Sequence, residues 1–184
     1  MAKTPSVMVE LGSDAADFNL LDTAGNKVCL SDFKETQGLL VIFMCNHCPY
    51  VKHLSKALSE FAKELMPKGL SIVAINSNDA DNYPDDSPEK MAIEVQQEDY
   101  IFPYCFDQTQ AVAKAYQAAC TPDFFLYDKQ LKLAYRGQFD NSRPANNEPV
   151  TGKDLKMAAE AVLTGLKPDT NQIASIGCNI KWKQ

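Results

Sequence analysis

Residues 39–49 read LLVIFMCNHCP, and this stretch decides the fold. Its first six side chains form a continuous apolar run, mostly branched or aromatic, which is typical of a strand buried on both faces of a sheet. Beyond it, apolar residues recur at intervals of three and four as far as Leu65, which predicts an amphipathic helix. The helix is expected to end near residues 67–69, Pro-Lys-Gly. Cys45 and Cys48 therefore lie where a buried strand passes into a helix.

The segments that follow indicate an α/β protein. Residues 70–75 are a second buried-strand candidate, and a strand-helix-strand unit of this length normally closes right-handed into a parallel pair. Further elements are expected as a surface loop over 76–88, a helix over 88–98, a short strand over 102–106, a helix over 110–119, a hairpin of 124–127 with 131–135, and a helix over 154–163. Since no repeat or flexible linker interrupts the sequence, a single domain over residues 1–184 is expected. Its core is placed at about 10–165, and residues 166–184 form an irregular C-terminal extension that docks onto it.

Composition and charge exclude several classes of function. The 184 residues carry a net charge of −6, whereas affinity for nucleic acid or for anionic membranes requires a basic face. The sequence shows neither an N-terminal secretion signal nor a membrane span, so a cytoplasmic location is expected. A chain of this length needs no disulfide or metal to complete its core, so no cofactor is expected and the six cysteines should be mostly reduced.

The two closely spaced cysteines predict thiol chemistry. A helix N-terminus favours an anion through its unpaired N–H groups and its dipole, and Cys45 is expected there as the nucleophilic thiolate. With two residues between them, the Cys48 sulfur can fold back to reach the first, so Cys48 is the expected resolving partner. His47 can carry positive charge near neutral pH and is expected to stabilise the Cys45 thiolate. The alternatives are two small apolar residues at a strand end, or half of a zinc site.

Three separate places in the sequence carry a family resemblance. Asp17-Phe18-Asn19-Leu20 precedes Gly25 and Leu30-Ser31-Asp32-Phe33, then comes Cys45-Asn46-His47-Cys48-Pro49, and Thr121-Pro122 precedes the strand candidate at 123–127. Together they resemble the thioredoxin-like superfamily, specifically its redoxin branch, which includes peroxiredoxins of the alkyl hydroperoxide reductase type. The resemblance implies a central mixed β-sheet flanked by helices, with an N-terminal β-hairpin.

The same resemblance implies a set of site residues. Pro122 would be cis and would face the dithiol, so that Thr121 and Pro122 present backbone to an extended substrate segment. Cys120 would lie close to the dithiol, where a third thiol could exchange disulfides or bind metal. Cys178, in the docking extension, is a further candidate redox thiol, and Arg143 is a candidate for binding an anionic substrate.

Departures from the family pattern narrow the function. Met44 stands where thioredoxins carry tryptophan, and Asn46-His47 replaces their Gly-Pro, which favours a specialised role. Cys45 stands where peroxiredoxins carry a threonine, which weakens the peroxidase interpretation. We therefore expect a thiol-disulfide oxidoreductase acting on protein or small-molecule thiols and disulfides. A thiol peroxidase acting on hydroperoxide and a non-catalytic metal-binding protein are the alternatives, and the sequence does not predict the oligomeric state.

Overall fold

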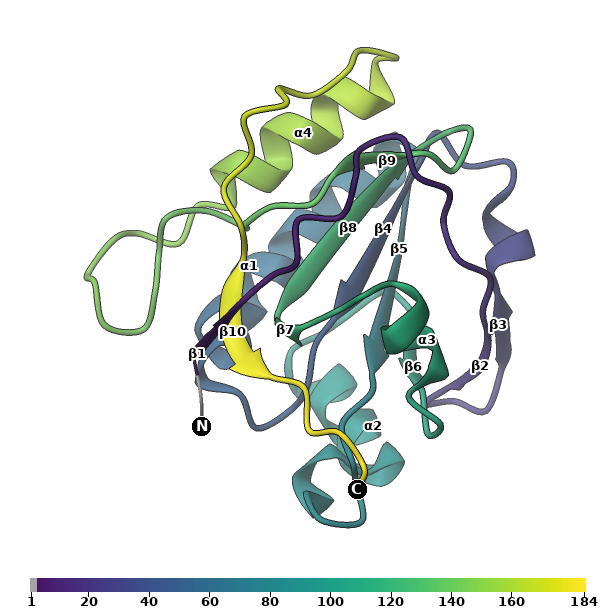
Figure 1. Cartoon of the computed structure of the whole chain (residues 1–184), viewed down its shortest axis with the longest axis vertical. Coiled ribbons are helices and arrows are strands. Elements are labelled where there is room, and N and C mark those ends of the chain that lie inside the picture. The colour runs from purple at the N-terminus through teal and green to yellow at the C-terminus, as the bar shows by residue number, and fades with distance from the viewer. Residues whose placement is uncertain (1–2) are drawn as a thin grey trace.

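The computed structural model describes residues 3–184 and is built on a mixed seven-stranded sheet (Figure 1). In spatial order its strands are β3 (Lys27–Cys29), β2 (Asn19–Asp22), β6 (Tyr104–Phe106), β5 (Leu70–Asn76), β4 (Gly38–Phe43), β8 (Asp123–Asp128) and β9 (Leu133–Tyr135). β5 pairs in parallel with both β4 and β6, whereas the other pairs in the sheet are antiparallel. The predicted parallel pair, the hairpin at 124–135 and the N-terminal hairpin are confirmed.

Helices and short turns connect these strands. The four α-helices are α1 (Pro49–Leu65), α2 (Pro88–Gln97), α3 (Ala111–Ala115) and α4 (Lys153–Leu163), and the 3-10 turns are η1 (Leu30–Phe33), η2 (Met66–Lys68) and η3 (Pro84–Asp86). η2 closes at Gly69, whose φ of 106° is readily adopted only by glycine, and this ends α1 where the sequence predicts. Within residues 3–184, no helix has the length and apolar character needed to cross a membrane.

The central strand β4 is buried along its whole length, and its side chains alternate between two apolar clusters. Leu40 and Ile42 face the cluster formed with α1 and α4, while Leu39, Val41 and Phe43 face the cluster formed with α3 and the N-terminal segments. Burial on both faces explains why this strand is a continuous apolar run rather than an alternating one. It also fixes the strand end that carries Cys45.

Two expectations about local structure are wrong. The helix expected over 110–119 is limited to α3, because Gln110 and Gln117 adopt positive φ values of 61° and 54° that interrupt a right-handed helix. The C-terminal extension, expected to be irregular, contains the strand β10 (Ile176–Asn179). β10 is the central strand of a second, three-stranded sheet, between β1 (Lys3–Pro5) and β7 (Cys120–Thr121) (Figure 1).

Candidate active site

The dithiol lies between β4 and α1, but the helix begins later than expected. α1 starts at Pro49, and Cys48, with extended φ and ψ of −76° and 123°, is its N-cap residue. The expectation that Cys45 lies at the helix N-terminus is therefore wrong. The intervening loop is held outside the helix because the backbone N–H of Asn46 donates to Asp86 at 2.8 Å. The Asn46 side chain also donates to the carbonyl oxygen of Asp85, at 2.8 Å.

Both sulfurs are buried beside Thr121. Cys45 is 1% exposed and Cys48 is 0% exposed, and both are free thiols. Cys45 Sγ lies 3.3 Å from Thr121 Oγ1, and the Cys48 thiol donates to the Thr121 carbonyl oxygen at 3.1 Å. The peptide bond between Thr121 and Pro122 is cis. The structure thus brings the predicted Thr121-Pro122 segment against the predicted dithiol.

The two thiols have opposite acidities. Hydrogen bonding from the Cys45 thiol lowers the pKa of Cys48, and although burial opposes this, the Cys178 thiol and the backbone N–H groups of Val51 and Cys178 lower it further. The pKa of Cys45 is raised by its hydrogen bond to Cys48, by burial and by the charge of Asp86. The reduced site therefore holds one negative charge, centred on Cys48, with Cys45 as a donor to it.

His47 interacts chiefly with a carboxylate rather than with Cys45. Its Nδ1 lies 2.7 Å from Asp86 Oδ2, at the distance of an ion pair, and this contact raises the pKa of His47. The imidazole stacks on the Tyr83 ring at a centroid distance of 5.7 Å and an interplanar angle of 9°. Its interaction with the dithiol is a weaker one with the Cys48 charge. The predicted stabilisation of Cys45 by His47 thus has no direct contact in this arrangement.

Asp86 is the site residue that the sequence did not single out. It is 0% exposed and accepts hydrogen bonds from the Asn46 backbone and from Asn78 Nδ2, the latter at 2.8 Å. Burial would raise its pKa, but these donors together with His47 lower it, so it is a carboxylate at neutral pH. The segment 76–88, expected to be a surface loop, instead buries its first four residues and Asp86. No spacing rule marks a single aspartate in a polar segment as buried.

The two further predicted thiols have different positions. In the antiparallel pairing of β7 with β10, Cys178 lies opposite Thr121, and Asn179 lies opposite Cys120. Side chains directly opposite each other share a face, so Cys178 lies on the dithiol side and Cys120 on the other. Cys120 Sγ donates to the carbonyl oxygen of Pro122 at 3.6 Å, and burial raises its pKa. The structure therefore brings Cys178 to the dithiol and turns Cys120 away from it.

Arg143 is engaged within its own loop. Its guanidinium donates to the carbonyl oxygens of Asp140 and Ser142, at 2.7 and 2.6 Å, and to Gln138 Oε1 at 2.6 Å. Arg143 and Pro122 line the same small pocket, whose volume of about 10 Å³ is enough for about one water molecule. The expectation that Arg143 binds an anionic substrate is not supported by these contacts, because its donors are already used.

The site also contains a set of metal-compatible donors. Cys45 Sγ, a ring nitrogen of His47 and a carboxylate oxygen of Asp86 all lie within 4.8 Å of one another. A thiolate, an imidazole and a carboxylate are ligands that zinc accepts. Cys120, which the sequence placed in the metal-binding alternative, is not part of this set.

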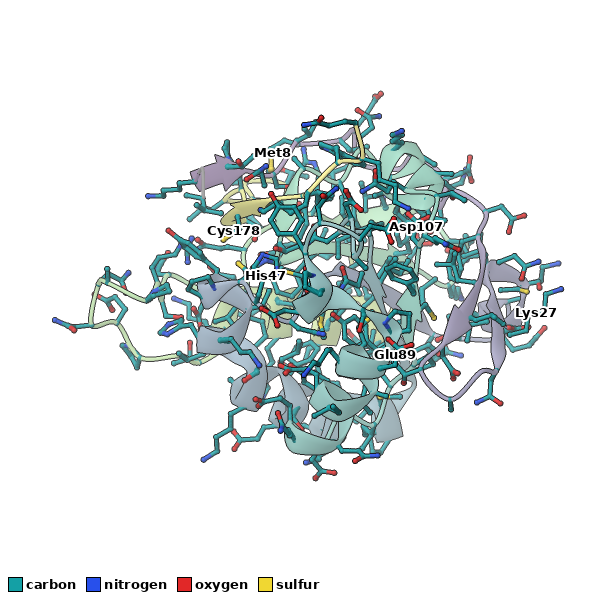
Figure 2. The ribbon with its side chains drawn as sticks, turned by 90° about the horizontal axis from the view of Figure 1, so that it is seen from below. Met8, Lys27, His47, Glu89, Asp107 and Cys178 are labelled. Carbon is teal, nitrogen blue, oxygen red and sulfur yellow. The ribbon has the colours of Figure 1, made fainter. Side chains whose placement is uncertain are left out.

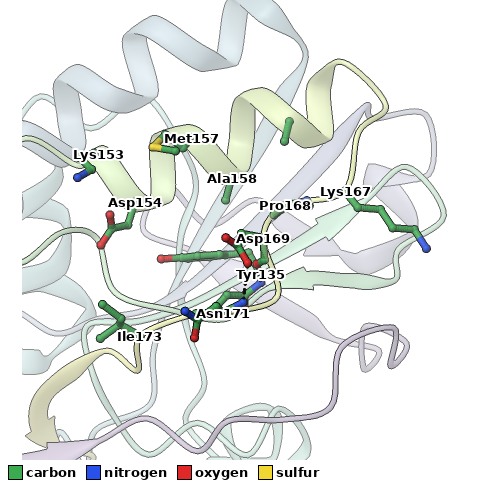
Figure 3. A pocket seen from close by; sticks show the side chains of 12 residues that line it. Tyr135, Lys153, Asp154, Met157, Ala158, Lys167, Pro168, Asp169, Asn171 and Ile173 are labelled. Atoms are coloured by element: carbon green, nitrogen blue, oxygen red, sulfur yellow. Dashed lines mark hydrogen bonds between the residues drawn. The ribbon is translucent and has the colours of Figure 1, made fainter.

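A larger hollow lies away from the dithiol, between α4 and residues 167–173 (Figure 3). Its volume is about 330 Å³, and Tyr135, Asp154, Met157 and Ile173 are among the residues that line it. None of the predicted site residues lines it. The candidate chemistry is therefore confined to the buried thiol cluster.

Comparisons with known proteins agree with this site. An uncharacterized conserved protein from Geobacillus kaustophilus is 50% identical, with a TM-score of 0.97 over 100% of this chain and 97% of that one. The thiol-disulfide oxidoreductase ResA of Geobacillus kaustophilus (strain HTA426) is 29% identical over 165 residues, which are 90% of this chain and 83% of ResA.

The fold itself is confirmed by more distant structures. The thioredoxin domain of a thiol-disulfide oxidoreductase from Bacteroides vulgatus is 21% identical, with a TM-score of 0.60 over 70% of this chain and 88% of that one. The thioredoxin-like fold with a central mixed sheet is thus confirmed. The sequence model of the AhpC/TSA family, to which the redoxin resemblance pointed, matches residues 11–136. Two buried thiols at the start of α1, beside a cis proline and within that match, show that the chain belongs to the AhpC/TSA family.

Proposed function

We propose that this protein is a thiol-disulfide oxidoreductase in which Cys45 and Cys48 exchange disulfides with thiol substrates. The observation that carries the proposal is the arrangement of two thiols that share one charge beside Thr121. One sulfur is prepared as a thiolate and the other as a proton donor, which is what opening and closing a disulfide requires. The relatives named thiol-disulfide oxidoreductase support the same activity.

The acidities assign a role to each sulfur. In the oxidised protein, an incoming thiolate that attacks Cys45 displaces Cys48, whose thiolate is stabilised at the start of α1 and therefore leaves readily. The substrate is then bonded to Cys45, and Cys48 resolves this mixed disulfide in the reverse direction. Thr121 Oγ1, 3.3 Å from Cys45 Sγ, is placed to hydrogen-bond that sulfur. This agrees with the division of roles predicted from the sequence.

The lowered pKa of Cys48 also gives the site a redox direction. Stabilising the thiolate stabilises the reduced form, which makes the disulfide a stronger oxidant. Since both sulfurs are at most 1% exposed, exchange with a substrate requires local opening of the segments that cover them. The substrates we propose are protein or small-molecule thiols and disulfides, and the cytoplasmic location stays a prediction.

A redox titration with cysteine mapping tests the function. The wild-type protein is equilibrated in glutathione buffers, quenched by alkylation and mapped by mass spectrometry. We expect a single Cys45–Cys48 disulfide at intermediate potentials, and Cys48→Ser should accumulate a mixed disulfide on Cys45. The double variant C45S/C48S should lose exchange, while Cys29→Ser, in the half-buried residue at the end of β3, should retain it. Unchanged exchange in C45S/C48S would contradict the proposal, and stoichiometric zinc or copper in the purified protein would favour the metal-binding alternative.

A thiol peroxidase is the second candidate, and one observation favours it. Cys48, the thiol with the lowered pKa, is at the position where peroxiredoxins carry their reactive cysteine, at the start of the helix after the central strand. Catalytic consumption of hydroperoxide with a thiol donor, abolished by Cys48→Ser, would establish this activity. Hydroperoxide consumption no faster than that of free cysteine would exclude it.

A further inference from the structure

Three thiols, not two, meet at Thr121. The hydroxyl of Thr121 contacts Cys45 and its carbonyl oxygen contacts Cys48. On the neighbouring strand, the Cα of Cys178 is directly opposite that of Thr121, so the two side chains project from the same face. Figure 2 shows Cys178 on β10 at the end of the molecule that also carries His47, from the loop between the other two cysteines. The third sulfur is thereby part of the same cluster.

The position of Cys178 is fixed on both sides. Before it, the backbone of Ser6 donates to Ser175 at 2.8 Å, and the Ser175 hydroxyl donates to the carbonyl oxygen of Pro122 at 2.7 Å. After it, the backbone N–H of Lys181 donates to Asn78 Oδ1 at 2.8 Å. These bonds hold β10 between the cis-proline segment and the segment that carries Asp86. Cys178 is accordingly 4% exposed.

Close approach of this strand depends on a glycine. A Cβ added to Gly177 would lie 2.0 Å from the carbonyl oxygen of Thr121, so any other residue would push β10 away. At the resulting distance both the thiol and the backbone N–H of Cys178 hydrogen-bond to the Cys48 sulfur. Cys48 therefore has two thiol neighbours, Cys45 on one side and Cys178 on the other.

From this geometry we infer that Cys178 is a third redox-active thiol, which exchanges with the Cys45–Cys48 disulfide to form a Cys48–Cys178 disulfide. The inference rests on the proposed oxidoreductase function, which supplies the first disulfide. The Cys178 thiolate attacks Cys48 Sγ, the new S–S bond forms, and the Cys45–Cys48 bond breaks. The electron pair goes to the Cys45 sulfur, which takes up one proton for the one that Cys178 released. The step changes the pairing without net oxidation or reduction.

The rearrangement has a consequence for the substrate. In the new pairing, β10 is bonded covalently to the start of α1, and Cys45 becomes a free thiol while the protein keeps its oxidising equivalents. Cys178 thus acts as an internal substrate for the dithiol. It allows the oxidised protein to present either a disulfide or a free Cys45 at the same place.

The test uses a variant in which only the proposed pairing can form. Cys45→Ser leaves five of the six cysteines, and oxidised glutathione should convert Cys48 and Cys178 into an intramolecular disulfide. The count of free thiols should fall from five to three, and mass spectrometry should identify the Cys48–Cys178 peptide. In C45S/C178S the same treatment should instead leave glutathione bonded to Cys48. In C45S/C120S the Cys48–Cys178 disulfide should still form, because Cys120 lies on the other face of β7.

Two results separate this inference from the proposed function. If the wild type forms Cys45–Cys48 but C45S accumulates only Cys48-bound glutathione, the third thiol is excluded while the oxidoreductase function stands. If the wild type forms no Cys45–Cys48 disulfide in any glutathione buffer, the function itself fails. Circular dichroism of each variant verifies that it is folded, and mapping the wild type at intermediate potentials gives a readout that requires no substitution.

Discussion

Replacing Asp86 by asparagine should destabilise the protein and do so more strongly at acidic than at alkaline pH. The carboxylate accepts two hydrogen bonds, from Asn46 and Asn78, and forms an ion pair with His47. Asparagine keeps one acceptor oxygen and turns an amino group toward a donor, so at least one charge-assisted hydrogen bond is lost. Such bonds contribute about 1.5–3 kcal/mol each, which sets the expected decrease in the free energy of unfolding at pH 9.

The ion pair with His47 adds the pH-dependent part. The pKa of His47 is raised in the folded protein, so its contribution is fully present below the unfolded pKa of about 6.5 and is lost as the pH rises through the folded pKa. The pKa of Asp86 is lowered, so its own contribution persists down to about pH 4. The Asp86→Asn variant should therefore lose more stability at pH 5.5 than at pH 9.

Urea unfolding at the two pH values measures both parts. The neighbouring Asp85→Asn is the matched control, because the Asp85 side chain is exposed and its substitution should change stability by no more than about 0.5 kcal/mol. Since the chain has only two histidines, proton NMR can follow His47 directly, with His53→Gln assigning the second resonance. Equal destabilisation by the two variants, or an unchanged His47 titration in D86N, would refute the assigned role of Asp86.

Three further variants test other contacts of the site. Thr121→Val removes the hydroxyl that lowers the pKa of Cys45, so the alkylation of Cys45 by iodoacetamide should shift to higher pH, and an unshifted profile would show that the 3.3 Å contact has no effect. Gly177→Ala forces β10 away from Thr121 and should cost about 1–3 kcal/mol in the free energy of unfolding, with faster alkylation of Cys178; unchanged labelling would mean that the close approach is not needed. Arg143→Gln should leave the rate of glutathione exchange within about twofold, because its donors are used inside the loop, and a tenfold loss would restore a substrate role.

The strongly patterned part of the fold could be predicted from the sequence. β4, α1 and β5 follow one another as an apolar run, an apolar stripe and a second apolar run, and tertiary packing requires both runs to be buried. α3 could not be delimited, because its alanine-rich sequence favours helix on both sides of the stop at Gln117. β10 could not be predicted because four residues containing a glycine and an asparagine have little strand propensity, and β1 and β7 lie far away in the sequence.

The candidate site shows the same division. Cys45 and Cys48 could be found because their spacing and their place between a strand and a helix are local features. The lower acidity of Cys45 depends on the turn at Asn46, which is held by Asp86 forty residues further along the chain. Cys178 could be named from its apolar neighbours, but its contact with Cys48 depends on strand register, which the sequence does not reveal.

The small sheet of β1, β10 and β7 also has a consequence for the order of folding. It joins Lys3 to Cys178 and Cys178 to Thr121, pairs separated by most of the chain, whereas β4, α1 and β5 are neighbours in sequence. Because closing long loops costs entropy before contacts repay it, these pairs should form last and open first. The amide protons of residues 176–179 should therefore exchange with solvent well before those of β4. The same partial unfolding would uncover the sulfurs, so access to the thiols would be governed by the least stable part of the fold.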